Sequence, residues 1–226
     1  MKLVSLNNSP EIFYSIQGEG ASIGTPSIFV RLFGCNLSCK WCDTDYTWND
    51  AKNVVTIDQN ELVREIKNYP AQHLVITGGE PLLQQDKILS LLNDLPGYTV
   101  EIETNGSVMP GSELLIRVQQ WNVSPKLKHS GNDVGKAFNK EALFAIALHQ
   151  NAWFKFVVAS EDDISEVLDV AKSCKIPRSR IILMPEATTQ EELIAKRPQL
   201  IEWCLKYNLR FSDRLHISVW GCKKGV

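Results

Sequence analysis

Apolar and polar residues alternate along the chain in two patterns, one typical of strands and one typical of helices. Short apolar runs rich in β-branched and aromatic residues predict strands at 27–34, 73–77, 98–104, 121–124, 153–158, 180–185 and 214–219. Between them, apolar residues that recur every three or four positions predict helices at 56–69, 81–95, 139–150, 161–174 and 188–208. Because strands and helices alternate so regularly, we expect an α/β fold. Its mostly parallel sheet with crossover helices is either open or curled toward a barrel.

The length and composition of the chain fit one sizeable domain. It has 226 residues, of which 44% are hydrophobic, enough to bury a core without disulfides or metals. The sequence contains no Pro/Gly/Ser-rich linker, so we predict one domain over residues 1–226.

Charge and hydropathy favour neither a nucleic acid nor a membrane as partner. The formal net charge is -2 at pH 7, which gives no broad attraction to nucleic acid or anionic lipid. No run of apolar residues approaches about 18, the length that a membrane-spanning helix needs. The first residues lack the basic and then apolar regions of a secretion signal. We therefore expect a cytoplasmic protein.

Unusual short motifs follow several of the predicted strands. They are GCNLSC, TGGEP, ETNG and SPK, in that order along the chain. In parallel α/β sheets, the loops after the carboxyl ends of the strands cluster at one edge, and ligands bind there. We expect the functional site at this edge.

Three cysteines, Cys35, Cys39 and Cys42, form a C-x3-C-x2-C motif after the first predicted strand. A structural zinc site would normally add a second pair of ligands, but the nearest candidates, His73 and His129, are isolated in sequence. A thioredoxin-like redox pair would leave Cys35 without a role. Three thiolates suit an iron–sulfur cube whose fourth iron stays open to a substrate or cofactor.

The remaining cysteines are scattered through the second half of the chain. A disulfide framework is typical of small secreted proteins, which this chain does not resemble. We predict that Cys174 and Cys204 are buried apolar residues on helices, because free cysteine is often buried. Cys222 stays unassigned.

The cysteine motif, with aromatic Trp41 just before its last cysteine, resembles the signature of radical S-adenosylmethionine (SAM) enzymes. In that superfamily, SAM chelates the unique iron of a [4Fe-4S] cluster, and one electron cleaves it to methionine and a 5′-deoxyadenosyl radical. The resemblance implies a partial TIM-like barrel with a radical SAM core. It also implies that the cluster is held by Cys35, Cys39 and Cys42.

A closer resemblance, covering almost the whole chain, is to the 7-carboxy-7-deazaguanine synthases of queuosine biosynthesis. The motifs SIQGEG, FVRLFGCNLSCKWCDT, VITGGEP, IETNG, VSPK and RLHISVWG occur in that family's order. The resemblance implies conversion of 6-carboxy-5,6,7,8-tetrahydropterin to 7-carboxy-7-deazaguanine, with ring contraction and release of ammonia. It further implies a homodimer and a flavodoxin or ferredoxin as electron donor.

The same resemblance assigns cofactor roles to residues around the cysteine loop. Glycine in TGGEP lets the backbone approach a ligand closely. The expected SAM-binding residues are Trp41, Cys42, Asp43, Gly78, Gly79, Glu80, Ser124, Pro125 and Lys126. Thr44 is expected to bind Mg²⁺, which prefers oxygen ligands. Without the family, Asp43 or Thr44 fits a helix cap better.

Substrate contacts are implied on a second set of residues. Arginine pairs well with a carboxylate, and Arg31 lies in a nearly apolar strand, where a charge usually has a partner. Taken alone, Glu103 and Lys126 fit surface residues equally, and a lone His216 is more often structural. The expected substrate-binding residues are Ile16, Gln17, Gly18, Glu19, Arg31, Thr77, Glu103 and His216.

Two other functions share the cysteine spacing. One is an activating enzyme that makes a glycyl radical on a protein partner, against which SIQGEG, Arg31 and His216 argue. The other is a non-catalytic module that binds about one zinc per chain and is colourless. An iron–sulfur protein would instead be brown, with iron and sulfide in equal amounts.

Overall fold

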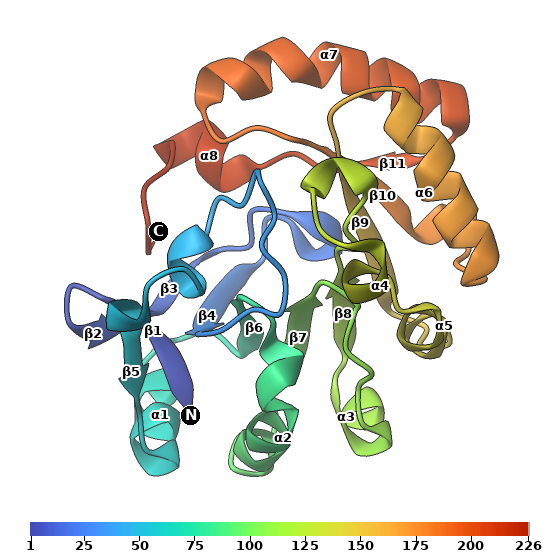
Figure 1. Ribbon diagram of the computed structural model, residues 1–226. Helices are drawn as coiled ribbons and strands as arrows, with labels where there is room; N and C mark the ends of the chain where they lie inside the picture. Colours follow the sequence, from blue (N-terminus) through green and yellow to red (C-terminus); the bar gives the residue numbers. More distant parts are fainter. Residues whose placement is uncertain (226) are drawn as a thin grey trace.

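One curved sheet of 11 strands forms the centre of the molecule (Figure 1). The structure, a computed structural model, describes residues 1–225; Val226, the last residue of the predicted domain, lies outside the described residues. The strands are β1 (Lys2–Leu6), β2 (Ser9–Pro10), β3 (Ile12–Ile16), β4 (Pro26–Leu32), β5 (Val54–Thr56), β6 (His73–Gly78), β7 (Thr99–Thr104), β8 (Gln120–Val123), β9 (Ala152–Val158), β10 (Ile181–Pro185) and β11 (Arg210–Phe211).

Neighbouring strands β4, β6, β7, β8, β9, β10 and β11 all run parallel. On the far side of β4, strands β1 and β3 pair with it antiparallel, and β2 and β5 pair antiparallel with β1. Strands β11 and β2 stand at opposite ends of the strand order, so the sheet is not closed. The predicted α/β fold, a partial TIM-like barrel of mostly parallel strands, is confirmed.

Helices cover the outer side of the curved sheet (Figure 1). Four begin with side-chain caps. Among them, Asp58 accepts from the Asn60 N–H at 2.9 Å, and Thr189 forms a capping box with Glu192. The helices are α1 (Gln59–Lys67), α2 (Gln85–Asn93), α3 (Ser112–Arg117), α4 (Val134–Ala137), α5 (Lys140–Ala147), α6 (Asp162–Ser173), α7 (Gln190–Tyr207) and α8 (Leu215–Trp220). No helix within residues 1–225 is both long and apolar enough to cross a bilayer.

The two faces of the parallel strands differ in chemistry because successive side chains point to opposite sides. On β7, Val100 and Ile102 join the main apolar core beneath the helices, whereas Glu103 faces the interior of the partial barrel. On β9, Phe154 and Phe156 join that core and Lys155 faces inward. The inner face of the sheet therefore presents charged side chains to the interior of the partial barrel.

Most predicted elements are present within a few residues of their expected ends. The prediction of buried cysteines is also confirmed, since Cys174 and Cys204 are buried at the end of α6 and within α7. The strand predicted at 214–219 is wrong, because this segment forms α8. A run of six residues is too short for apolar periodicity to separate strand from helix. Only Ile217 of α8 is buried, in a small cluster with Ala187 and Leu193.

Candidate active site

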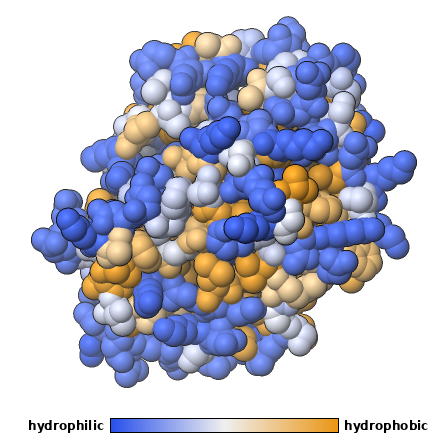
Figure 2. All heavy atoms as spheres, viewed as in Figure 1, coloured by the Kyte–Doolittle hydropathy of each residue, from blue (hydrophilic) through white to orange (hydrophobic). Residues whose placement is uncertain are grey.

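A cavity of about 360 Å³ lies inside the partial barrel, beside the carboxyl ends of the parallel strands. Its walls come from β3, β4, β6, β7, β8, β9 and β10, from the cysteine loop, and from α8 with the C-terminal segment. On the face shown in Figure 2, apolar side chains gather across the middle and polar ones surround them. The cavity occupies the edge where ligands bind in parallel α/β folds.

The cysteine loop supplies three free thiols to this cavity: Cys35, Cys39 and Cys42 are all half-buried and line it. Burial raises the pKa of the Cys35 thiol to about 11, although the Leu37 N–H donates to its sulfur at 3.4 Å. Within residues 1–225, no three His, Cys, Asp or Glu side chains converge where one metal ion would fit. Each cysteine of an iron–sulfur cube binds a different iron, so a cluster does not require such convergence.

The turn after β6 packs directly beneath the cysteine loop. The Glu80 N–H donates to the Gly34 carbonyl at 2.8 Å, and a Cβ at position 79 would lie 2.2 Å from that same oxygen. That Cβ would also lie 2.9 Å from the Cβ of Cys35. Only glycine fits at Gly79, since any side chain would displace Cys35, the first cysteine of the motif.

Glu80 lies behind the cavity wall rather than in it. Its buried carboxylate accepts hydrogen bonds from the Thr104 hydroxyl at 2.8 Å, the Asn105 N–H at 2.7 Å and the Leu82 N–H at 3.0 Å. Burial raises the pKa of Glu80, and these donors oppose the shift. Glu80 therefore ties the turn after β6 to the turn after β7.

The SPK segment after β8 completes the wall next to Trp41. Lys126 donates to the Ser124 hydroxyl at 2.9 Å, and its ammonium lies 5.2 Å from the centre of a Trp41 ring. The Trp41 side chain also stacks on His129, with ring centroids 5.6 Å apart. Pro125 is buried and does not line the cavity.

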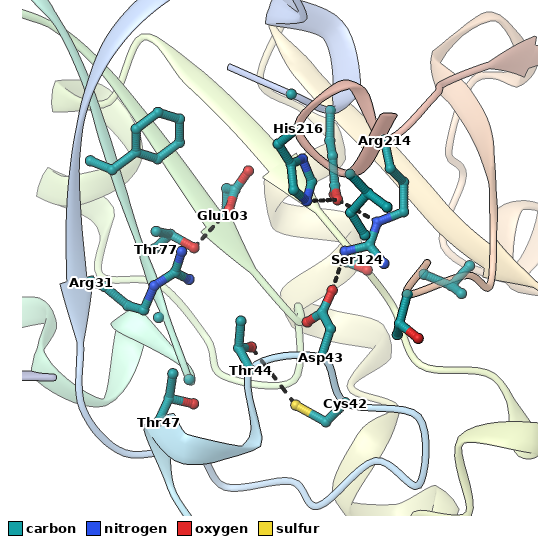
Figure 3. Close-up of a pocket in the computed structure, with 18 of the residues that line it drawn as sticks. Arg31, Cys42, Asp43, Thr44, Thr47, Thr77, Glu103, Ser124, Arg214 and His216 are labelled. Atoms are coloured by element: carbon teal, nitrogen blue, oxygen red, sulfur yellow. Dashed lines mark hydrogen bonds and ion pairs between the residues drawn. The ribbon is translucent and has the colours of Figure 1, made fainter. Parts of the chain in front are cut away.

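On the β4–β7 side, polar groups pair with one another around an open centre (Figure 3). The Arg31 guanidinium donates to Glu11 at 2.9 Å, which supplies the partner expected for a charge in an apolar strand. Although burial alone would lower the pKa of Arg31, Glu11 raises it, so Arg31 is always charged. Thr77 donates to Glu103 at 2.7 Å, and the Gln17 amide donates to Glu103 at 3.1 Å.

Across the cavity, Glu19 sits at the centre of a buried ion cluster. Its carboxylate is paired with Lys155, accepts from Arg214 at 2.8 Å, and lies 3.7 Å from His216. Burial alone would raise the pKa of Glu19, but Lys155 and Arg214 hold it well below its ordinary value. Arg214 also pairs with Asp43, which directly follows the last cysteine of the motif (Figure 3). This ion cluster around Glu19 thus joins the cysteine loop to the SIQGEG segment.

Most residues predicted for the site meet in this one cavity; Glu80 and Pro125 lie outside it. Those that line it are Ile16, Gln17, Gly18, Glu19, Arg31, Cys35, Cys39, Trp41, Cys42, Asp43, Thr44, Thr77, Gly78, Gly79, Glu103, Ser124, Lys126 and His216.

Sequence analysis missed several residues of the cavity wall. Lys155 carries the signal that identified Arg31, a lone charge in an apolar strand, and could have been found in the same way. Arg214 was hidden by the wrong strand prediction for its segment. Cys222, left unassigned, lines the cavity and contacts the Thr188 carbonyl. Next to it, Lys224 lies 3.6 Å from the centre of the Tyr46 ring.

Comparison with known proteins gives consistent results. The model of the radical SAM superfamily matches residues 30–197. The 7-carboxy-7-deazaguanine synthase of Hyperthermus butylicus is 42% identical, over 92% of this chain and 91% of that protein. The synthase of Pyrobaculum aerophilum is 37% identical, over 95% of each chain. The crystal structure of QueE from Escherichia coli superposes with a TM-score of 0.71 at 28% identity, covering 91% of this chain and 92% of that one.

Superfamily membership implies a [4Fe-4S] cluster and SAM, and three half-buried thiols with a glycine turn packed against them fit such a group. The cavity, the cysteine motif and the comparisons agree, and the chain belongs to the radical SAM superfamily and, within it, to the 7-carboxy-7-deazaguanine synthases.

Proposed function

We propose that this enzyme converts 6-carboxy-5,6,7,8-tetrahydropterin to 7-carboxy-7-deazaguanine, with release of ammonia, in the biosynthesis of queuosine and related 7-deazapurines. The observation that carries the proposal is that one cavity is lined both by the three cysteines and by Arg31, Gln17 and Glu103. A small polar substrate with a carboxylate suits the charged inner face. A protein substrate, as a glycyl-radical activating enzyme requires, does not need a cavity lined by such charged groups.

The cofactor side of the cavity is assigned to the cysteine loop and the turns around it. Cys35, Cys39 and Cys42 would hold the cluster, whose reduced form, with SAM on its open iron, supplies a 5′-deoxyadenosyl radical for hydrogen abstraction from the substrate. The residues proposed to bind SAM are Trp41, Cys42, Asp43, Gly78, Gly79, Ser124 and Lys126. For Glu80 and Pro125 we propose a supporting role behind the wall, because neither lines the cavity.

The substrate side is assigned to Ile16, Gln17, Gly18, Glu19, Arg31, Thr77, Glu103 and His216. Arg31 would pair with the substrate carboxylate, since Glu11 holds the guanidinium through Nε and leaves its other nitrogens free to donate. Glu103 would accept from amino groups of the pterin, because Thr77 and Gln17 fix its orientation. The ion cluster around Glu19 would hold His216 against the SIQGEG segment.

We also propose that Mg²⁺ binds at Thr44 and orients the substrate carboxylate. The Thr44 side chain lines the cavity, and its hydroxyl lies 3.8 Å from the Cys42 sulfur, beside the cofactor position. The Thr44 hydroxyl would be the one protein ligand of the ion. It fits Mg²⁺ because this ion keeps several waters and accepts oxygens from its substrate. Thr44→Val keeps the shape and removes the ligand, so it should abolish the stimulation of product formation by Mg²⁺.

The decisive assay for the proposed reaction uses anaerobically reconstituted enzyme with SAM, a strong reductant and the carboxypterin. We expect 7-carboxy-7-deazaguanine and ammonia in equal amounts, and no product when SAM is omitted. Formation of deoxyadenosine without consumption of the pterin would leave the superfamily assignment intact and would refute the proposed substrate.

A cytoplasmic location is proposed from the charge and hydropathy of the sequence, and a homodimer and reduction by a flavodoxin or ferredoxin are proposed on family resemblance alone. We propose as well that residues 1–226 form a single domain, which is supported by the one sheet that joins all the strands from β1 to β11. Sedimentation of the loaded enzyme and reduction by purified flavodoxin would test the dimer and the electron donor.

A further inference from the structure

Residues 130–132, in the segment between β8 and α4, pack against the cysteine loop. The Lys40 N–H donates to the Ser130 carbonyl at 2.9 Å, and the Ser38 N–H donates to the Asn132 side-chain oxygen at 2.9 Å. Gly131 has a φ of +77°, and a Cβ there would lie 2.5 Å from the Cε of Lys40. The backbone N–H groups on both sides of Cys39 are therefore held by residues 130–132.

The amide of Asn132 is oriented by this contact. Its oxygen accepts from a backbone N–H, which can only donate, so its nitrogen must point the other way. That nitrogen lies 3.1 Å from the Cys39 sulfur and 3.1 Å from the Ser130 hydroxyl oxygen. Asn132 therefore directs an N–H group at a sulfur assigned to the cluster.

The other two sulfurs have weaker or different partners. Cys35 receives the Leu37 backbone N–H at 3.4 Å, and the Cys42 sulfur lies 3.8 Å from the Thr44 hydroxyl. Among the contacts of residues 1–225 with these three sulfurs, the Asn132 contact is the shortest, and it comes from a side chain that substitution can remove.

We propose that Asn132 is a positioning residue that raises the reduction potential of the cluster through its N–H···S bond to Cys39. Reduction adds negative charge to the cluster and its sulfur ligands. A donor aimed at one of those sulfurs stabilises the reduced form more than the oxidised form. This inference rests on the proposed assignment of Cys39 as a cluster ligand.

The test is a potentiometric titration of the reconstituted enzyme, with iron and sulfide measured on the same samples. In Asn132→Leu, which lacks the donor, we expect the ratio of reduced to oxidised cluster at a fixed potential to fall about tenfold. For a one-electron couple this corresponds to a reduction potential about 59 mV lower than that of the wild type. Asn132→Asp keeps an acceptor for the Ser38 N–H but cannot donate, so its potential should fall at least as far.

Asn36→Leu is the matched control, because Asn36 also neighbours a cluster cysteine. Its side-chain amide forms hydrogen bonds with Ser107 and Asn105 rather than with a cysteine sulfur. The reduction potential of this variant should therefore equal that of the wild type. An unchanged potential in fully loaded Asn132→Leu and Asn132→Asp would overturn the inference. Loss of the cluster from both variants would overturn it too, because Asn132 would then only maintain the loop. A wild-type enzyme without an iron–sulfur cluster would refute the proposed function instead.

Discussion

The ion cluster around Glu19 yields a stability prediction that tests whether this charged centre holds the two sides of the cavity together. Glu19→Gln removes the carboxylate and leaves the ammonium of Lys155 without its ion-pair partner. The Lys155 side chain is only 9% exposed and that of Glu19 13%. The buried cation therefore cannot regain full hydration in the variant.

The expected magnitude follows from that burial. Breaking a buried ion pair by removing one partner costs roughly 3–5 kcal/mol. We take about 3 kcal/mol, the low end of that range, because Arg214 keeps its pairing with Asp43. For a chain of this length each kcal/mol shifts the melting temperature by about 2–4 °C, so the loss should be about 6–12 °C.

Thermal unfolding followed by circular dichroism, on anaerobic protein without cluster, measures this directly. Glu161→Gln is the control, since it breaks the exposed pair of Glu161 and Lys206 and should leave the melting temperature unchanged. If Glu19→Gln melts at the wild-type temperature, the buried ion cluster does not stabilise the fold and the reasoning is wrong.

Three further predictions concern the cavity wall. Arg31→Met should raise the KM for the carboxypterin at least about tenfold, since a charge-assisted pair contributes roughly 1.5–3 kcal/mol, while binding of SAM measured by calorimetry is unchanged. Gly79→Ala should lose most of its iron on reconstitution, because its Cβ would lie 2.2 Å from the Gly34 oxygen; Gly111→Ala, whose Cβ would meet only the Gln85 side chain at 3.6 Å, should load normally. Burial, together with Glu103, raises the pKa of Glu101 to about 7, so the folded state holds this proton more tightly than the unfolded state. The stabilisation by protonated Glu101 is complete at low pH and is lost as the pH rises through 7. Between about pH 5 and about pH 8, the melting temperature should therefore fall less in Glu101→Gln than in the wild type. An equal fall of the melting temperature in both proteins would contradict this prediction.

Most of the parallel strands and the longer helices between them could be predicted because their apolar runs and periodic segments are long enough to be distinct. β9, for example, combines Phe154, Phe156 and Val158 on one face, a pattern that burial in a parallel sheet explains. The short strands β2, β5 and β11 have no such signal. They exist because neighbouring strands offer open edges, which only the folded chain brings close.

Much of the site could be located because cysteine spacing and strand-end motifs are local in sequence. Its ion pairs could not, since they join distant segments. Arg214 and Glu19 are 195 residues apart, and no local pattern links them. Asn132 lies 93 residues from Cys39 in a segment without a distinctive motif, and only the docking of loop 130–132 brings the two together.

The central claim is that three cysteines hold a cluster whose fourth iron is open to SAM. Its most direct test is the electron paramagnetic resonance spectrum of the reduced, reconstituted enzyme before and after addition of SAM. We predict equal iron and sulfide and a spectrum that changes when SAM is added, because SAM becomes a ligand of the cluster. Zinc in place of iron and sulfide, or a cluster whose spectrum SAM leaves unchanged, would contradict the account.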